Sequence, residues 1–595
     1  MRVSDRIAEL LVEFGVKDIF MVTGGGAMHL NDAFGRNKYL KVTNMHHEQS
    51  CSMAADGYSR LSNTLAGVNV TTGPGGINAL NGVYGAWTDS VPMFIVSGQV
   101  KRETLNANNS KLRQLGDQEN NITYMVKKIT KFSYILKNSD FVDDVITKAL
   151  KIATSGRPGP VWIDVPIDVQ GAIYNKGTQK SLNSLSVPKN KKVKVADIEK
   201  LIKLIKNSKR PAIIGGGGIR ASGSHKEFLK FINKTNIPVL SAWNAHDIIE
   251  NSHKNYAGRP GTVGDRPGNF IAENCDLLIV MGSRLNIRQI GYNFKEFSKN
   301  SFKVMIDIDS EELDKKTLSI DLKLNYDLKD FLKKINENGE NLNISNHRKY
   351  LKWAKSLNQE YPIFKETYTK TRTGKINPYH FVDELFKHLQ QGDKIITSDG
   401  TAVVTTFQGA VLKKGQRLFS NSGSASMGFG LPASIGAALA AKGDSIFCIE
   451  GDGSIQMNIQ ELATVKNHNL PLKIFVLSND GYHSIRQTQN KYFSDNIVGC
   501  GPDSGLYFPD FELIAKGYGL KYLKINSTKN LIKNMSKTIN TPGPILCEVK
   551  IDKDQEFEPK ASSRMYKNGK IESAPLYDLY PFLDSEIIDE IINYE

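Results

Sequence analysis

Short, almost uninterrupted apolar runs recur along the 595-residue chain, and each is followed by a glycine-rich turn and then an amphipathic helical pattern. A run that is apolar at every position is typical of a parallel strand buried on both faces. Strands that alternate with helices favour doubly wound α/β layers. The predicted strands are 18–22, 67–70, 93–96, 161–165, 212–214, 277–280, 304–308, 395–398, 445–449 and 473–477.

Changes in composition divide the chain, which is longer than a typical single domain. Residues 174–194 are rich in Lys, Asn, Ser and Gln, residues 336–347 are rich in Asn and Glu, and residues 356–377 are polar. The sequence therefore predicts three doubly wound parallel-sheet domains and a short irregular C-terminal tail in which the α/β pattern stops. The predicted ranges are 1–173, 190–335 and 375–555 for the domains and 556–595 for the tail.

The formal net charge of +15 raises nucleic acid as a partner. However, the lysines are dispersed over helix-like segments such as 191–209 and 323–334, and we find no nucleic-acid-binding motif. We therefore expect no nucleic-acid partner, and we interpret the charge as a solvated surface that suits anionic small substrates.

Several features bear on location. No apolar run is long enough to cross a bilayer, and residues 1–14 follow an amphipathic helical pattern rather than that of a signal peptide. The five cysteines are scattered and none lies in a CxxC pair, so we expect neither a disulfide framework nor a zinc site. Together these features predict a cytoplasmic protein with no membrane segment.

The most specific motif is the run 451–454, Gly-Asp-Gly-Ser, which follows one predicted strand, while Asn479 and Gly481 follow the next. Glycines at a strand end let the backbone approach a diphosphate. The Asp452 carboxylate is repelled by phosphate but can bind a cation that the diphosphate also binds. Asp452, the Asn479 amide oxygen and the Gly481 carbonyl would give Mg²⁺ three oxygen ligands, with two diphosphate oxygens and a water as the others. The alternative is a pair of ordinary turns, in which these residue types are common.

This motif resembles the thiamine diphosphate fingerprint, with Ser478-Asn479 where the family more often has two asparagines. From about residue 1 to residue 555 the chain is similar to the large subunit of acetolactate synthase, in order and without large gaps. The resemblance implies thiamine diphosphate and Mg²⁺ as cofactors. It also implies that a 2-oxo acid loses carbon dioxide and that its remaining carbons join a second carbonyl. The minimum active form would be a homodimer, or a homotetramer, because in this family two chains share each cofactor.

The segment 44–49, before the helix 54–60, resembles the family's "HEQ" segment. The resemblance implies that Glu48 hydrogen-bonds N1′ of the aminopyrimidine. A carboxylic acid there stabilises the imino tautomer, whose nitrogen takes the proton from thiazolium C2. Without the resemblance, a helix-capping or surface glutamate would be the commoner interpretation.

Other segments carry implied site residues. Gln118 falls on the family's active-site glutamine, Lys131 on a lysine beside the substrate, and Arg288 on an arginine near the substrate entrance. Met427 falls on the methionine that holds the cofactor in its bent shape. Without the resemblance, a methionine among glycines would be interpreted as a core residue that fills an irregular gap. The remaining positions implied to contact thiamine diphosphate are Gly25, Gly73, Pro74, Asn78, Ser426, Gly451, Gly453 and Ser454.

Four consecutive glycines, 215–218, follow a predicted strand and precede a helix, as in a nucleotide-binding turn. In the family this unit binds FAD, which is retained structurally and does no net redox work. The resemblance therefore implies FAD as a third cofactor. The positions implied to bind it are Gly216, Gly217, Arg284, Asp307 and Asp309, and the run 258–261 (Gly-Arg-Pro-Gly) matches a family segment beside the flavin.

Two pocket positions depart from the family pattern. Asp117 stands where the family has Phe, and Thr488 stands where it has a bulky Trp in an ungapped alignment. These changes predict a larger and more polar acceptor cavity. We expect pyruvate as the donor, and either a second small oxo acid or a bulky polar ketone, such as a nucleotide-linked keto-sugar, as the acceptor.

Three further hypotheses stay open at this point. One is a simple 2-oxo acid decarboxylase or oxidase, and another is an enzyme that opens a cyclic diketone. The third is a cofactor-binding protein without catalysis, against which the joint presence of Glu48, Asp452 and Asn479 argues.

Overall fold

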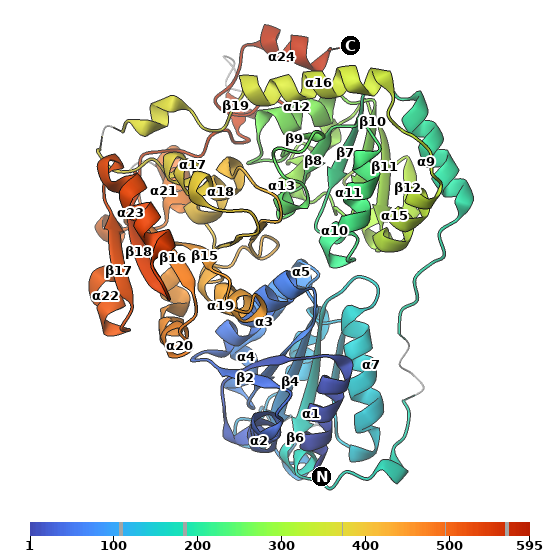
Figure 1. Cartoon of the computed structure of the whole chain (residues 1–595). Coiled ribbons are helices and arrows are strands. Elements are labelled where there is room, and N and C mark those ends of the chain that lie inside the picture. Colours follow the sequence, from blue (N-terminus) through green and yellow to red (C-terminus); the bar gives the residue numbers. More distant parts are fainter. Residues whose placement is uncertain (106–110, 183–186, 372, 494–495, 566–570, 595) are drawn as a thin grey trace.

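A computed structural model describes the chain except residues 106–110, 183–186, 372, 494–495, 566–570 and 595. It confirms the predicted α/β class, because the described residues form three six-stranded parallel sheets, each with helices packed around it (Figure 1). No helix in the described part of the chain has the length and apolar character needed to cross a membrane.

The first sheet has the strand order β2-β1-β3-β4-β6-β5. Its strands are β1 (Asp18–Met21), β2 (Lys41–Asn44), β3 (Ala66–Val70), β4 (Met93–Gln99), β5 (Phe132–Ile135) and β6 (Pro160–Pro166). Its helices are α1 (Val3–Phe14), α2 (Met28–Arg36), α3 (Glu48–Ser62), α4 (Pro74–Asn78), α5 (Leu80–Thr88), α6 (Ile122–Met125), α7 (Val142–Thr154) and α8 (Ile167–Gln170).

The middle sheet has the order β12-β11-β10-β7-β8-β9. Its strands are β7 (Pro211–Gly215), β8 (Val239–Ser241), β9 (Tyr256–Gly258), β10 (Leu277–Met281), β11 (Phe302–Asp307) and β12 (Leu322–Asn325). Its helices are α9 (Val195–Asn207), α10 (Gly218–Ala221), α11 (His225–Asn233), α12 (Arg266–Asn274), α13 (Ile287–Ile290), α14 (Ser310–Asp314) and α15 (Leu328–Glu337), and α16 (Ser345–Glu360) follows them.

The third sheet repeats the strand order of the first, as β14-β13-β15-β16-β18-β17. Its strands are β13 (Lys394–Thr397), β14 (Arg417–Phe419), β15 (Ile446–Gly451), β16 (Leu472–Ser478), β17 (Lys521–Ile525) and β18 (Ile545–Lys550). Its helices are α17 (Pro378–His388), α18 (Thr401–Gly409), α19 (Gly430–Ala440), α20 (Leu462–Asn467), α21 (His483–Tyr492), α22 (Phe511–Gly517) and α23 (Thr528–Asn540).

The strand orders locate three switch points, where successive connections leave in opposite directions along the sheet. These lie at the carboxyl ends of β1 and β3, of β7 and β10, and of β13 and β15. Ligands of open α/β sheets bind in the crevice at such a point. The glycine-rich turns noted in the sequence follow these strands, so the fold places them where ligands are expected.

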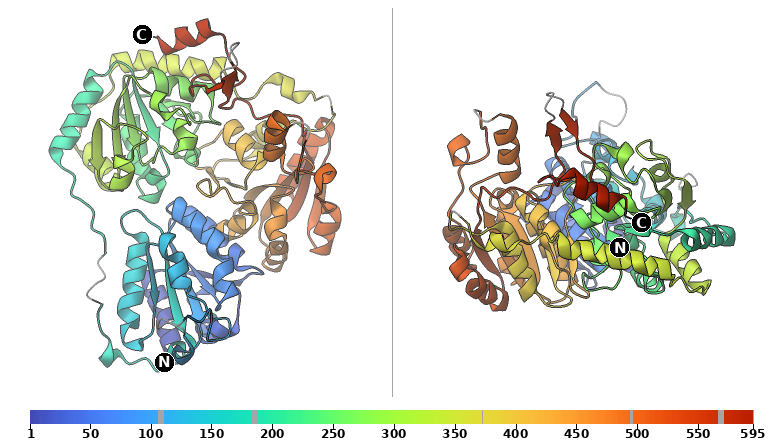
Figure 2. Two further views of the ribbon diagram at one scale, coloured as in Figure 1. Left: turned by 180° about the vertical axis from the view of Figure 1, so that it is seen from behind. Right: turned by 90° about the horizontal axis from the view of Figure 1, so that it is seen from above.

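The first unit packs mainly on the third, through α3 and α19 (Figures 1 and 2). A Cβ atom added to Gly57 would lie 2.1 Å from the carbonyl oxygen of Ala433, and one added to Gly436 would lie 1.8 Å from that of Ala54. Such distances are too short for any side chain. The two helices are therefore in backbone contact, and one apolar core runs across both sheets.

The C-terminal tail, expected to be irregular, contains two short antiparallel strands, β19 (Ser563–Met565) and β20 (Ile571–Ser573), and the helix α24 (Ser585–Ile592). The tail runs from the third unit to the middle unit, where Tyr594 stacks on Trp353 at a ring distance of 4.3 Å. Figure 2 shows α24 lying beside α16. The apolar spacing of Ile588 and Ile591 buries one face of this helix, which explains why it forms.

Candidate functional sites at the strand ends

The carboxylate of Asp452 joins the ends of two neighbouring strands in the third sheet. β15 and β16 are paired in parallel with Gly451 opposite Leu477, so the residues that follow them emerge at the same edge. The side chain of Asp452 is buried and accepts hydrogen bonds from the backbone N–H groups of Gly453 (2.8 Å), Asn479 (3.0 Å) and Gly481 (3.2 Å). The two turns are thereby held around one carboxylate.

The oxygen atoms around Asp452 suit a hard cation. Burial raises the pKa of Asp452 to about 6, and a bound cation would offset this by favouring the charged form. The Asn479 amide nitrogen donates to Thr401 Oγ1 at 3.3 Å, so its amide oxygen is directed elsewhere. A carboxylate, an amide oxygen and a backbone carbonyl fit Mg²⁺. In the described residues no group of three His, Cys, Asp or Glu side chains offers a competing metal site.

Gly481 has a backbone conformation that other residues rarely adopt. Its φ is +126°, and an added Cβ would lie 1.9 Å from the carbonyl oxygen of Cys500. Any side chain here would displace the turn that carries the Gly481 carbonyl. The glycine is therefore required at the position where the sequence places a metal ligand.

Ser454 connects this strand end to the segment that precedes α19. Its hydroxyl contacts Ser398 Oγ at the end of β13 and accepts a hydrogen bond from the Gly428 N–H at 2.8 Å. Ser426, in the same segment, donates to Asn81 Oδ1 of α5 at 2.7 Å. The structure thus places five of the expected cofactor-binding residues around one switch point. They are Ser426, Met427, Gly451, Gly453 and Ser454.

A second group of expected residues meets at the switch point of the first sheet. Glu48 is buried at the first position of α3, and the Asn78 amide donates to its Oε2 atom at 3.0 Å. Gly73 has a φ of +66°, and a Cβ there would lie 2.6 Å from the carbonyl oxygen of Gln118. Pro74 begins α4 directly after this turn. The structure therefore brings Glu48, Gly73, Pro74, Asn78 and Gln118 together.

Gly25 lies at the same switch point, in a helical turn directly after β1. A Cβ atom at this position would meet nothing within 4 Å, whereas one on either neighbouring glycine would collide with Thr71 or Thr72 after β3. Gly25 therefore presents its backbone to open space.

A buried network holds the loop that carries Gln118. The Gln99 amide nitrogen donates both to the Asn120 carbonyl and to Asp164 Oδ2, each at 2.9 Å, and the Asn120 amide donates to the Gly73 carbonyl at 3.2 Å. Burial raises the pKa of Asp164 to about 7. The network fixes the loop over the Gly73 turn, and none of its members stands out in the sequence.

Lys131 and Arg288 lie outside these two groups. The Lys131 ammonium group donates to the carbonyls of Ile152 and Ser155, so it caps the end of α7, and burial lowers its pKa to about 8. The Arg288 guanidinium lies 5.1 Å from the ring centre of Trp243. Burial lowers the pKa of Arg288, and the opposed charge of Asp399, which follows β13, raises it. Arg288 thus lies between the middle and third units.

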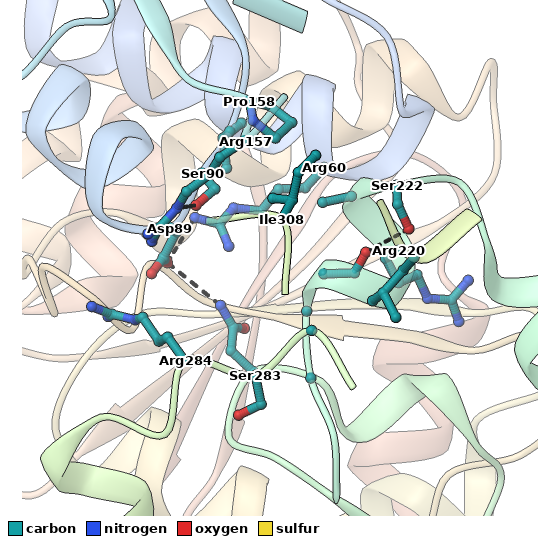
Figure 3. Close-up of a pocket in the computed structure, with 18 of the residues that line it drawn as sticks. Arg60, Asp89, Ser90, Arg157, Pro158, Arg220, Ser222, Ser283, Arg284 and Ile308 are labelled. Atoms are coloured by element: carbon teal, nitrogen blue, oxygen red, sulfur yellow. Dashed lines mark hydrogen bonds and ion pairs between the residues drawn. The ribbon is translucent and has the colours of Figure 1, made fainter. Parts of the chain in front are cut away.

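A cavity of about 710 Å³ lies at the switch point of the middle sheet and is lined by all three units (Figure 3). The turns after β7 and β10 touch, because a Cβ on Gly216 would lie 2.3 Å from the Gly282 carbonyl oxygen. A Cβ on Gly217 would meet nothing within 4 Å. The volume suits a dinucleotide, whose size falls within the range of ligand pockets.

The charges around this cavity are mostly paired. Arg60 contacts Asp56 and Asp89, and both Arg220 and Arg417 contact Asp247. Within the described part of the chain, Arg284 has no hydrogen-bond or ion-pair partner, and Figure 3 shows it beside Ser283. An unpaired guanidinium next to a glycine turn suits a pyrophosphate.

The expected flavin residues are placed differently from one another. Asp307 lines the cavity together with Gly216, Gly217 and Arg284, and burial raises its pKa to about 6. Asp309 is not among the lining residues. Its carboxylate pairs with Arg157 of the first unit at 2.9 Å and accepts from the Glu311 N–H, so it links two units and caps α14.

The run 258–261 is also turned away from the cavity. The buried Arg259 donates to the carbonyls of Phe407 (3.0 Å), Gln408 (3.2 Å) and Ala410 (2.6 Å) at the carboxyl end of α18. A cation there stabilises the helix end. The cavity instead receives Trp243 and Asn244, which no sequence motif marks.

Family models match each of the three units. "Thiamine pyrophosphate enzyme, N-terminal TPP binding domain" matches residues 1–121, the central domain of the same family matches residues 198–335, and its C-terminal TPP binding domain matches residues 400–549.

Relatives match the chain over nearly its whole length. It is 30% identical over 570 residues to the acetolactate synthase large subunit of Lactococcus lactis subsp. lactis (strain IL1403), with 96% of each chain covered. It is 30% identical to the acetolactate synthase large subunit of Cyanidium caldarium, over 94% of this chain and 95% of the relative. It is 32% identical to the chloroplastic acetolactate synthase 2 of Brassica napus, over 92% and 85%. The chain therefore belongs to the thiamine pyrophosphate enzymes, within the family of acetolactate synthase large subunits.

Proposed function

We propose that this protein uses thiamine diphosphate and Mg²⁺ to decarboxylate pyruvate and to join the two-carbon unit to a second carbonyl compound. Family membership supports this reaction. The observation that carries the proposal is the arrangement of Asp452, Asn479 and Gly481, which are held together by backbone hydrogen bonds at neighbouring strand ends.

In this proposal the third sheet holds the cation and the diphosphate. Asp452, the amide oxygen of Asn479 and the Gly481 carbonyl would bind Mg²⁺, while Gly453 and Ser454 would contact the phosphates. Met427, in the segment tied to Ser454 through Gly428, would lie beside the rest of the cofactor. Thiamine diphosphate supplies an electron sink for the electrons left when carbon dioxide departs.

Glu48 would hold the proton that activates the cofactor. Asn78 donates to Oε2, so we assign the proton to Oε1, which would face N1′ of the pyrimidine when the cofactor is bound. Oε1 lies 3.2 Å from the Cβ position of Gly75, which lies in the turn after β3. A glycine at this point leaves room for a ring to approach the acid.

Gln118 would orient the substrate at the first sheet, where the Asn120 and Gln99 hydrogen bonds fix its loop. Arg288 would bind a substrate carboxylate, because a guanidinium can hold a carboxylate through two parallel hydrogen bonds. Within this chain Lys131 caps the end of α7. Its role as a substrate residue stays a prediction.

FAD is the ligand that we propose for the middle cavity. The Gly216 and Gly217 turn and Arg284 would hold the pyrophosphate, and Asp307 would accept from ribose or adenine. The fit rests on the cavity volume and on the unpaired guanidinium. Heating the purified protein and recording the absorbance of the released material tests this assignment.

A homodimer is the smallest active form that we propose. Large apolar side chains are exposed on helices of both outer units, and apolar surface of this kind often marks an interface with another chain. On the first unit they are Ile77, Tyr84, Trp87, Tyr124 and Met125, and on the third they are Ile485, Tyr492 and Phe493. A second copy of the chain would cover them.

The test is an assay of the purified protein with pyruvate, thiamine diphosphate and Mg²⁺, in which released carbon dioxide and ligated product are both measured. The expected result is a ligation product that requires both cofactors. Activity that does not respond to their removal, or a product limited to aldehyde, would contradict the proposal, and the latter would favour a simple decarboxylase.

A bulky polar acceptor is a second candidate. Asp117 and Thr488 are both solvent-exposed and polar, and they replace the aromatic residues that the family pattern places in the pocket. Comparison of pyruvate alone with pyruvate plus a nucleotide-linked keto-sugar decides between the acceptors. Rapid acetolactate release from pyruvate alone would eliminate the sugar acceptor as the main activity.

A further inference from the structure

Thr401 and His483 form a buried hydrogen-bonded pair beside the proposed cation site, and the reaction scheme above does not use them. Thr401 is the first residue of α18 and His483 is the first residue of α21, and both are buried. Thr401 Oγ1 lies 2.9 Å from His483 Nδ1 and accepts the Asn479 amide nitrogen at 3.3 Å. The pair therefore holds a proposed metal ligand through its amide nitrogen, which leaves the amide oxygen without a contact to the pair.

The other side of the His483 ring is held by Gln487 and the C-terminal tail. The Gln487 amide nitrogen lies 2.9 Å from His483 Nε2 and 3.3 Å from the Gln555 carbonyl. Lys560 donates to Gln487 Oε1 at 3.4 Å, and the Phe557 ring lies edge-on to the imidazole at a centroid distance of 5.4 Å. The tail and α21 thus enclose the imidazole.

The donors and acceptors in this chain have a consistent direction. The Gln487 amide nitrogen can only donate, so His483 Nε2 accepts this hydrogen bond and carries no proton. Because Gln487 donates to Nε2, the single ring proton lies on Nδ1 and is donated to Thr401 Oγ1. That oxygen receives two donors, one from His483 and one from Asn479. The Asn479 amide nitrogen is consequently fixed toward Thr401, and its oxygen is left for the cation.

We propose that Thr401 and His483 are positioning residues that hold the Asn479 amide oxygen toward Mg²⁺, and that Gln487 and Lys560 extend this support to the tail. The inference rests on the proposed function, because it requires the cation. Hydrogen-bond partners of metal ligands typically change metal affinity by about 10–100-fold when they are removed. The C-terminal tail therefore has a role in cofactor binding as well as in joining two units.

The experiment uses the full-length protein, freed of metal with a chelator and then titrated with Mg²⁺ at saturating thiamine diphosphate. Binding is followed by tryptophan fluorescence and by the midpoint of thermal unfolding, neither of which depends on turnover. Thr401→Val keeps the side-chain shape and removes the hydroxyl, so the half-saturating Mg²⁺ concentration should rise by about 10–100-fold. Thr401→Ser restores the hydroxyl and should restore binding. Lys560→Met should give a smaller rise.

Thr406→Val is the matched control. Thr406 lies on the same helix, is fully buried, and has a hydroxyl without a hydrogen-bond partner in the described residues, so its replacement should leave Mg²⁺ binding unchanged. Unchanged Mg²⁺ binding in Thr401→Val, or an equal change in both valine variants, would overturn the inference.

Asn479→Ala separates this inference from the proposed function. If that variant loses Mg²⁺ affinity while Thr401→Val does not, the metal site stands and the positioning role is refuted. If Asn479→Ala binds Mg²⁺ and thiamine diphosphate as the native protein does, the metal site itself is wrong and both proposals fall.

Discussion

The two outer sheets and the middle sheet differ in what surrounds their switch points. The first and third sheets share one strand order, and their switch points carry Glu48 and Asp452, in units whose helices expose large apolar side chains. The middle sheet has a different strand order, and its switch point opens into a cavity that the other two units also line. The same α/β principle thus yields sites of two kinds, one enclosed within a single chain and one that we propose a second chain completes.

The contrast extends to charge. Around the middle cavity most arginines are paired with carboxylates from the same chain, which leaves Arg284 for a ligand. At the outer switch points Glu48 and Asp452 face no cation among the described side-chain contacts, and backbone or amide N–H groups hold them instead. In the proposed function, cofactor atoms would contact the outer carboxylates, whereas Arg284 and the glycine turn of the middle site would hold the pyrophosphate of FAD.

Replacement of Asp452 should give the largest effect and should separate the two kinds of site. Asp452→Asn keeps the shape but removes the charge that the cation requires. We expect turnover and Mg²⁺-dependent thiamine diphosphate binding to fall by more than about 100-fold, because even the partners of metal ligands are worth 10–100-fold. Flavin content should not change. Calorimetry measures the binding of thiamine diphosphate, and absorbance measures the flavin content. A parallel loss of flavin would contradict the proposed difference between the outer and middle sites.

Glu48→Gln tests the other outer sheet. The amide can still accept from Asn78 but cannot pass a proton to the pyrimidine, so we expect turnover to fall by about 10²–10⁴-fold. Binding of thiamine diphosphate should stay within a few-fold of the native value, as measured by fluorescence titration. Turnover at the native rate would refute the role assigned to Glu48.

Arg284→Gln probes the enclosed site. Hydrogen bonds to charged groups are worth about 1.5–3 kcal/mol, so flavin affinity should fall by roughly 10–100-fold. The binding of thiamine diphosphate should be unaffected. Arg348, an exposed arginine on α16, provides the control, since Arg348→Gln should change neither affinity. Equal flavin binding in the two variants would remove Arg284 from the cavity's ligand contacts.

Asp164→Asn gives the smallest expected effect on activity and concerns the buried support of the first sheet. Burial raises the pKa of Asp164 from its ordinary value of 3.8 to about 7, so the folded state keeps a proton that the unfolded state releases. Its contribution to the free energy of unfolding is present below about pH 4 and is lost as the pH rises to about 7, by at most about 1.4 kcal/mol per pH unit. The neutral asparagine lacks this dependence.

Urea unfolding of both proteins between pH 4 and pH 8 measures this difference. The free energy of unfolding of the native protein, minus that of Asp164→Asn, should decline with rising pH. A difference that stays constant would show that Asp164 titrates normally.

The fold class could be predicted from the sequence because central strands such as β4, β10 and β16 are buried on both faces and are apolar throughout. The edge strands β2, β5 and β17 escaped prediction because they are partly exposed and their residues are mixed. The buried strands β8, β9 and β18 were also missed. The paired turns at Asp452 and Asn479 were visible because each follows an apolar strand directly.

Contacts between distant segments could not be predicted in this way. Thr401 and His483 are 82 positions apart and meet only because β13 and β16 end at the same edge of the sheet. Asp309 and Arg259 matched family motifs, but the structure engages them in contacts between units, and Lys131 caps a helix. A motif indicates which residues lie at a strand end, while the direction of each side chain depends on the neighbouring unit.

The backbone contact between α3 and α19 has a practical consequence. The first unit is fastened to the third by a buried helix pair and to the middle unit by the ion pairs of Arg157 with Asp309 and Glu312, so the segment 174–194 is not needed to hold it in place. A single protease cut in that segment should leave two fragments that still migrate as one particle in a native gel. The same segment is the natural place to divide the gene, because two separately synthesised halves could reassemble through the helix pair and the Arg157 ion pairs.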